Sequence, residues 1–83
     1  MRVVYSKKFR KKFSKLDRKL QQKVFSAISN IPTGDIKKLT GKRTSVIYRL
    51  RVSKYRILFN LDDELVKILI IDSRGDVYKN IGD

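Results

Sequence analysis

The chain has 83 residues, with 21 lysines and arginines against 8 aspartates and glutamates, which gives a formal net charge of +13. A chain of this length can bury one small core, so we expect a single domain spanning residues 1–83. The absence of cysteine and histidine excludes disulfides, thiolate metal sites and an imidazole general base. The charge indicates a partner that is negatively charged: nucleic acid, the ribosome, an acidic protein or an anionic membrane. The alternative is a solvated basic surface without a partner.

No apolar stretch of the sequence is long enough to cross a bilayer, and the first residues lack the apolar region of a signal peptide. The lack of cysteine suits a reducing compartment. We therefore expect a soluble cytoplasmic protein with no membrane partner.

The N-terminal segment predicts a short strand followed by a basic helix. Arg2–Tyr5 contain strand-forming residues, and Ser6 is suited to cap the next helix. In that helix Phe9, Phe13 and Leu16 recur at helical spacing, and cationic side chains cover its other sides. Such a helix also fits a membrane surface or a calmodulin-type partner, but its apolar stripe is narrow and has no tryptophan. We expect it to pack on a sheet.

A second helix is predicted to begin after Asp17, which can cap it, and to end before Pro32. Its apolar stripe consists of Leu20, Val24, Phe25, Ile28 and Ile31. The two helices should therefore form a helical hairpin with one apolar side.

Residues 36–45 are rich in lysine and arginine around Gly41, with too little hydrophobic pattern for a regular element. We predict a basic connector there. Its side chains Lys38, Lys42 and Arg43 are candidates for RNA binding through phosphates.

The remainder of the chain predicts an antiparallel meander. Strands are expected near residues 46–52 and 55–61, joined by the two-residue turn Ser53-Lys54. A further strand, residues 65–71, is apolar at nearly every position, which is typical of an interior strand buried on both faces. The predicted fold class is α+β: an N-terminal strand, a two-helix hairpin and then an antiparallel sheet whose one face the helices cover.

The other face is expected to be open and basic. Arg49 and Arg51 alternate with apolar residues and so share one face, and the two-residue turn places Arg51 opposite Arg56. On the apolar face the expected pairs are Tyr48 with Phe59, Leu50 with Ile57 and Val52 with Tyr55. Like charges directly opposite each other destabilise a sheet, so we expect them to be kept for an anion such as a phosphodiester backbone.

RNA cleavage suits this set of residues, because the 2′-hydroxyl of the substrate is the nucleophile and the protein needs only to position and neutralise the phosphate. Arg49, Arg51 and Arg56 are suited to stabilising the phosphoryl oxygens. Tyr78 can take a proton, stack on a base or simply close the sheet edge, and Lys54 can assist or remain an exposed turn residue.

The acidic residues are sparse, and only Asp62-Asp63-Glu64 is dense. These three carboxylates fit either a divalent-cation site or a charged hairpin tip that keeps the sheet edge soluble. We expect the hairpin tip, and no metal ion or other cofactor.

The sequence resembles the RelE/ParE superfamily, the toxins of bacterial and archaeal toxin–antitoxin pairs, over nearly its whole length. The resemblance rests on the order of the strand, the basic helical hairpin and the motifs Lys38-Leu39-x-Gly41, Tyr48-Arg-Leu-Arg51, Tyr55-Arg56-Ile-Leu-Phe and Ser73-Arg-Gly-Asp-Val-Tyr78. None of these motifs is specific alone, but their order and spacing together are.

The resemblance to RelE-type members implies a fold like that of small microbial ribonucleases and a ribosome-dependent endoribonuclease that cuts messenger RNA by 2′-hydroxyl attack without a metal ion. It implies that Arg49 replaces a catalytic lysine, that Arg56 stabilises the phosphate and that Arg74 and Tyr78 form a C-terminal catalytic pair. Lys54 falls in the adjacent turn and is included among the catalytic candidates. The resemblance also implies a cognate acidic antitoxin as a partner.

At three positions the chain departs from the family pattern. Ile47 stands where a second sheet lysine often occurs, Ser73 where many relatives have histidine, and Gly75 where a second arginine is common. These departures leave room for an enzyme that depends on the ribosome. Two other functions stay open: a ParE-like protein that binds DNA gyrase, and a non-catalytic module that binds RNA or the ribosome.

Overall fold

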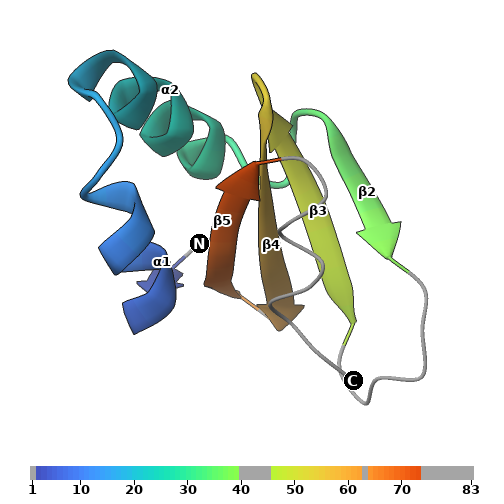
Figure 1. The fold of residues 1–83 in the computed structure, drawn as a ribbon. Coiled ribbons are helices and arrows are strands. Elements are labelled where there is room, and N and C mark those ends of the chain that lie inside the picture. Colours follow the sequence, from blue (N-terminus) through green and yellow to red (C-terminus); the bar gives the residue numbers. More distant parts are fainter. Residues whose placement is uncertain (1, 40–45, 63, 74–83) are drawn as a thin grey trace.

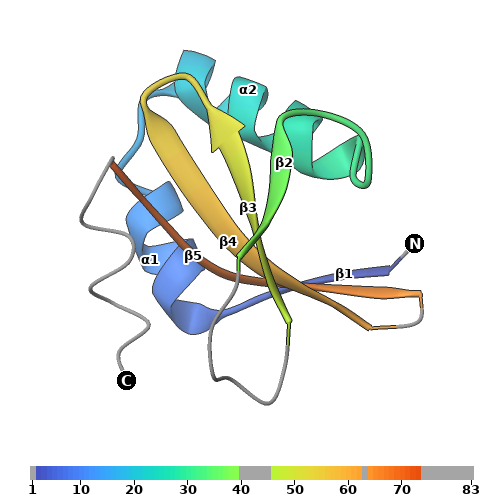
Figure 2. The same ribbon diagram turned by 90° about the vertical axis from the view of Figure 1, so that its right-hand side faces the viewer.

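The computed structural model describes residues 2–39, 46–62 and 64–73. The elements in chain order are β1 (Arg2–Tyr5), α1 (Lys7–Phe13), α2 (Arg18–Ser29), β2 (Ile36–Leu39), β3 (Ile47–Val52), β4 (Tyr55–Asp62) and β5 (Leu65–Ser73). All five strands join one sheet in the order β1-β5-β4-β3-β2, and both helices lie on one side of it (Figure 1). Figure 2 shows the same arrangement with β2 in front and the helices behind. The predicted α+β class is confirmed.

The sheet is mixed. β1 pairs parallel with β5, and the other three neighbouring pairs are antiparallel. The apolar pattern therefore predicted correctly that β5 is an interior strand, since it lies between β1 and β4. Within the described ranges, no helix is long and apolar enough to span a bilayer.

Both helices begin at the caps that the sequence predicts. The side chain of Ser6 accepts a hydrogen bond of 3.0 Å from the N–H of Phe9 at the start of α1. The carboxylate of Asp17 accepts one of 2.8 Å from the N–H of Leu20 at the start of α2. Each cap satisfies a backbone donor that has no partner inside its helix, which fixes where the helix starts.

The main core lies between the helices and the sheet. Its buried members are Phe9, Val24, Ile28, Ile31, Leu50, Val52, Ile57, Phe59, Val66, Ile68 and Ile71. Leu16 packs against this core as predicted, although α1 ends at Phe13 and Leu16 lies in the link to α2. Within this core α1 packs on β5 and α2 on β3.

The face opposite the helices is only partly basic. Ile47, Leu58 and Ile70 are buried there and form a second apolar cluster, with Leu39 and Leu69 packed around them. The sequence predicts a basic face, and the structure interrupts it with this apolar cluster, which separates the arginines near the β3–β4 turn from Lys67 on β5. The apolar part accounts for the burial of β5 on both faces.

The prediction that residues 36–45 form no regular element is wrong for Ile36–Leu39, which form β2. Ile36 packs against the main core and Leu39 against the second cluster. The two lysines between them suit an edge strand, because charged side chains there discourage pairing with other chains. Four residues with apolar side chains only at the ends give no alternating pattern, so the hydrophobic periodicity misses this strand.

Candidate nucleic-acid interface

The β3–β4 hairpin has the register that the sequence predicts. Ser53 and Lys54 form its two-residue turn, with Ser53 at φ 56°, and Arg51 lies opposite Arg56. The three pairs expected on the apolar face are also present: Tyr48 with Phe59, Leu50 with Ile57 and Val52 with Tyr55. Because Leu50 and Ile57 belong to the main core, Arg49, Arg51 and Arg56 lie on the face away from the helices.

Lys37 also lies on this face, and sequence reasoning missed it. Lys37 is directly opposite Arg49 in the β2–β3 pair, whereas Lys38 is opposite Tyr48. Tyr48 stacks on Phe59 of the main core, so Lys38 belongs to the helix side of the sheet. Four cations thus gather at one end of the face, and we call them the basic cluster: Lys37, Arg49, Arg51 and Arg56.

The guanidinium groups of the basic cluster differ in their surroundings. The side chain of Arg49 is 16% exposed, and its Nη2 lies 3.0 Å from Oδ1 of Asp35. Arg51 is exposed and Arg56 is half-buried. No hydrogen bond or ion pair within the described part of the chain engages the guanidinium of Arg51 or Arg56. These two groups are therefore able to bind an anion without first breaking a contact.

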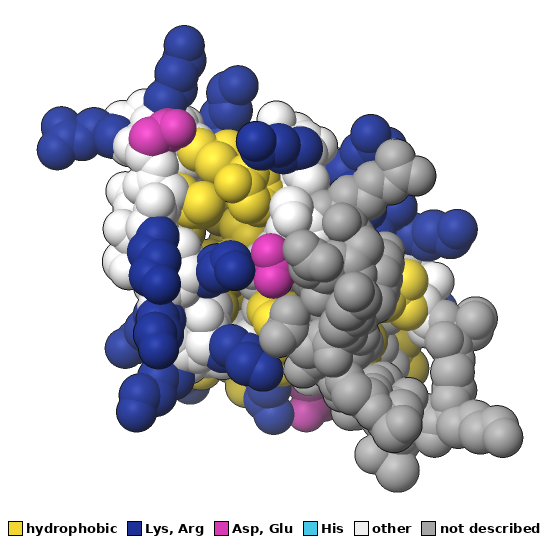
Figure 3. Space-filling view, in the orientation of Figure 1, with side chains coloured by type: hydrophobic (Ala, Val, Ile, Leu, Met, Phe, Trp, Pro, Cys, Tyr) yellow, Lys and Arg dark blue, Asp and Glu magenta, His cyan; other side chains and the backbone are white. Residues whose placement is uncertain are grey.

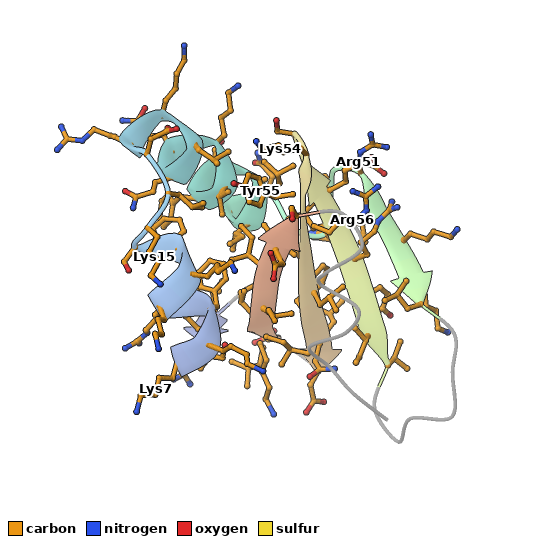
Figure 4. The ribbon with its side chains drawn as sticks, viewed as in Figure 1. Lys7, Lys15, Arg51, Lys54, Tyr55 and Arg56 are labelled. Atoms are coloured by element: carbon orange, nitrogen blue, oxygen red, sulfur yellow. The ribbon has the colours of Figure 1, made fainter. Side chains whose placement is uncertain are left out.

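Asp72 borders the basic cluster on the β5 side. It is the cross-strand partner of Arg56, and its carboxylate lies 3.5 Å from Nζ of Lys12 on α1. A cavity of about 220 Å³ next to this residue is lined by three lysines of α1 and by Lys15, together with Ile70 and Ile71. Figure 3 shows cationic side chains spread over the helical side of the molecule, and Lys7 and Lys15 lie far from Arg51 and Arg56 in Figure 4. The helical layer thus carries a second, more dispersed positive surface.

Lys54 is not part of the basic cluster. Its ammonium group lies 5.8 Å from the centroid of the Tyr55 ring, a cation–π geometry. Tyr55 packs against the main core, and Figure 4 shows Lys54 and Tyr55 on the helix side of Arg51 and Arg56. In this structure Lys54 contacts the Tyr55 ring, and its catalytic role stays a prediction.

The burial of Ile47 gives a physical reason for one departure from the family pattern. Ile47 shares the face of the basic cluster but is only 6% exposed, packed with Leu58 and Ile70. A lysine there would place an ammonium group among apolar side chains, which is costly without a partner. The cations consequently end at Arg49 on this strand.

Four of the predicted site residues lie outside the described residues: Lys42, Arg43, Arg74 and Tyr78. Their roles stay predictions. Asp63 of the predicted acidic tip is outside as well, while Asp62 ends β4 and Glu64 lies in the turn before β5. Among the residues that are described, no three potential metal ligands come together.

Comparison with solved structures identifies the fold. No protein-family model matches the chain, and no curated protein matches it significantly. A chain of the archaeal RelE–RelB complex from Pyrococcus horikoshii matches with a TM-score of 0.74 at 24% identity, over 89% of this chain and 94% of that one. A chain of the RelB–RelE antitoxin–toxin complex from Methanococcus jannaschii matches with a TM-score of 0.73 at 21% identity, over 93% and 96%.

A chain of the toxin–antitoxin complex RelBE2 from Mycobacterium tuberculosis has a TM-score of 0.70 at 28% identity, and the match covers 88% of this chain and 96% of that one. These similarities extend over almost all of each chain, so they concern the whole fold rather than one motif. The resemblance seen in the sequence is thereby confirmed. The chain therefore has the fold of the RelE-type toxins.

Proposed function

We propose that this protein is the toxin of a toxin–antitoxin pair and acts as a ribosome-dependent endoribonuclease on messenger RNA. The observation that carries the proposal is the basic cluster, which gathers three guanidinium groups and one ammonium group on a sheet face that the helices leave uncovered. Such a like-charged group destabilises the sheet unless an anion binds to it. The RelE-like fold supports the same conclusion.

The proposed reaction uses the RNA's own 2′-hydroxyl. The 2′-oxygen loses its proton and attacks the adjacent phosphorus, and the bond from phosphorus to the 5′-oxygen breaks as that oxygen gains a proton. The products are a 2′,3′-cyclic phosphate and a 5′-hydroxyl. Arg51 and Arg56 are suited to hold the non-bridging oxygens through paired N–H groups, since negative charge builds up there in the transition state. Arg74 and Tyr78 remain the proposed C-terminal catalytic pair.

We assign the alignment of the reacting groups largely to the ribosome. The two carboxylates that border the basic cluster within the described residues, Asp35 and Asp72, are each in contact with a cation. The cluster therefore offers charge stabilisation more readily than a general base. A ribosome that holds the message in an in-line geometry would supply the missing proximity.

The proposed partners follow from charge. An acidic antitoxin segment that folds on binding would neutralise a chain of net charge +13, and charge complementarity would speed its encounter. Related chains were crystallised in toxin–antitoxin complexes. We propose that residues 1–83 act as one domain in the cytoplasm, where the protein would encounter both the ribosome and the antitoxin.

The test is cleavage of a defined message on purified ribosomes. We expect cuts that leave 5′-hydroxyl and 2′,3′-cyclic phosphate ends, and a single 2′-deoxynucleotide on the 5′ side of the cut should abolish cleavage there. Cleavage that survives the deoxy substitution would refute 2′-hydroxyl attack. Ribosome binding without cleavage would favour a non-catalytic module, and intact messages with double-strand DNA breaks in producing cells would favour a gyrase inhibitor.

A further inference from the structure

Asp35 contacts the basic cluster from the solvent side. Its Oδ1 accepts a hydrogen bond of 3.0 Å from Nη2 of Arg49. The two partners are unequally placed, because the side chain of Asp35 is 58% exposed and that of Arg49 only 16%. An ion pair with an exposed partner adds little to folding stability. The ion pair matters more for the orientation of the Arg49 guanidinium group than for folding stability.

The loop that carries Asp35 is itself fixed. The N–H of Arg51 donates a hydrogen bond of 3.0 Å to the carbonyl of Asp35, and the N–H of Ile36 donates one of 2.9 Å to the carbonyl of Gly34. Gly34 has φ +122°, which side-chain-bearing residues rarely adopt, and a Cβ there would lie 3.4 Å from Cδ1 of Leu50. The backbone conformation of this turn therefore fixes the position of Asp35 next to Arg49.

Arg49 has a guanidinium donor that no described residue accepts. Its Nε is buried and has no hydrogen-bond partner within the described part of the chain. The guanidinium group is planar, so fixing one nitrogen fixes the directions of all its N–H groups. Without Asp35, repulsion from Lys37 directly across the ladder would push the guanidinium away from this arrangement.

We propose that Asp35 is a positioning residue, which holds the Arg49 guanidinium so that its Nη N–H groups not engaged by Asp35 meet the scissile phosphate together with those of Arg51 and Arg56. This inference rests on the proposed function, since it concerns the same site. Asp35 acts through Arg49 and does not touch the RNA. Its own negative charge opposes phosphate binding, so it weakens affinity while it raises the rate of the chemical step.

The opposite signs of these two effects allow a sharp test with Asp35→Asn. Single-turnover cleavage of a ribosome-bound message, measured over a range of protein concentrations, separates the maximum rate from the half-saturating concentration. We expect the maximum rate to fall roughly tenfold, as for a small misplacement of a catalytic group, with the half-saturating concentration unchanged or lower. Asp35→Glu should restore part of the rate.

The matched control is Glu64→Gln, which makes the same charge change in the turn before β5, at the far end of the sheet. It should leave the maximum rate unchanged. A wild-type maximum rate in Asp35→Asn would overturn the positioning role, as would a parallel loss of rate and affinity together with lower thermal stability, which would mean a purely structural role.

A measurement on the protein alone separates this inference from the proposed function. The Arg49 Nε–H signal in nitrogen-15 NMR spectra, assigned with an Arg49→Lys variant, should be protected from solvent exchange and lose about tenfold of that protection in Asp35→Asn. Equal protection in both proteins would overturn the positioning. If the wild type cuts no message, the proposed function is wrong, and Asp35 has no catalytic role even if it orients Arg49. If it cuts but Asp35→Asn is unaffected, only the positioning fails.

Discussion

Lys37 and Lys38 carry the same charge and are neighbours in the chain, yet the pleat of β2 assigns them to opposite faces of the sheet. Lys37 lies beside Arg49 in the basic cluster, and Lys38 lies beside Tyr48 on the helix side. This pair makes it possible to distinguish a local effect of the basic cluster from the general effect of positive charge.

We expect Lys37→Ala to lower the rate of message cleavage at subsaturating protein by about tenfold, the value of one charge-assisted hydrogen bond to a phosphate. Lys38→Ala removes the same charge and should change the rate by less than about twofold. Both rates are measured on ribosome-bound message under identical salt conditions. Equal losses in the two variants would show that RNA does not bind at the basic cluster.

At this scale, prediction from the sequence succeeded where alternation and a two-residue turn suffice. The pairing of Arg51 with Arg56 follows from those two features alone. Lys37 could not be found in this way, because its position depends on the pairing of β2 with β3. The contact of Lys54 with Tyr55 was missed because alternation does not set the direction of a turn side chain.

Ser6 joins three elements of the fold. Besides capping α1, its hydroxyl donates a hydrogen bond of 2.5 Å to the carbonyl of Leu69, and its N–H donates one of 2.9 Å to the carbonyl of Ile68. It therefore ties β1 and α1 to β5 at the point where the parallel pair ends.

We expect Ser6→Ala to lower the free energy of unfolding by about 1–2 kcal/mol, because a helix cap and a partly buried hydrogen bond are lost together. The matched control is Ser29→Ala, since the Ser29 hydroxyl donates a local hydrogen bond to the carbonyl of Phe25 at the exposed end of α2. That change should stay within about 0.5 kcal/mol. Urea unfolding of both variants checks this, and equal stabilities would show that Ser6 does not join the layers.

The β-bulge in β5 could not be predicted from the sequence. Leu58 pairs with Ile70 and Phe59 with Ile68, which leaves Leu69 as the extra residue. The bulge exchanges the faces of all residues after it, so Ile71 reaches the main core and Asp72 lies beside Arg56. A run of apolar residues carries no signal of such a shift, because every position in it is compatible with burial.

The whole molecule combines a net charge of +13 with two separate positive surfaces, the basic cluster and the lysines along α1. Binding to ribosome and message should therefore release counterions from several phosphates. We expect the half-saturating concentration to rise about fiftyfold between about 50 and 200 mM monovalent salt at constant magnesium, for roughly four phosphate contacts. An almost flat response would contradict binding through phosphates.

The central claim is that the arginines on the sheet face opposite the helices stabilise the phosphate being cut. The most direct test compares the maximum single-turnover rate of message cleavage by the wild type, Arg56→Ala and the control Arg18→Ala, whose arginine is exposed at the start of α2. We expect Arg56→Ala to lose about a hundredfold or more in rate, with a free energy of unfolding within about 0.5 kcal/mol of the wild type. Arg18→Ala should cut within about twofold of the wild-type rate. A folded Arg56→Ala protein that cuts at the wild-type rate would contradict the claim.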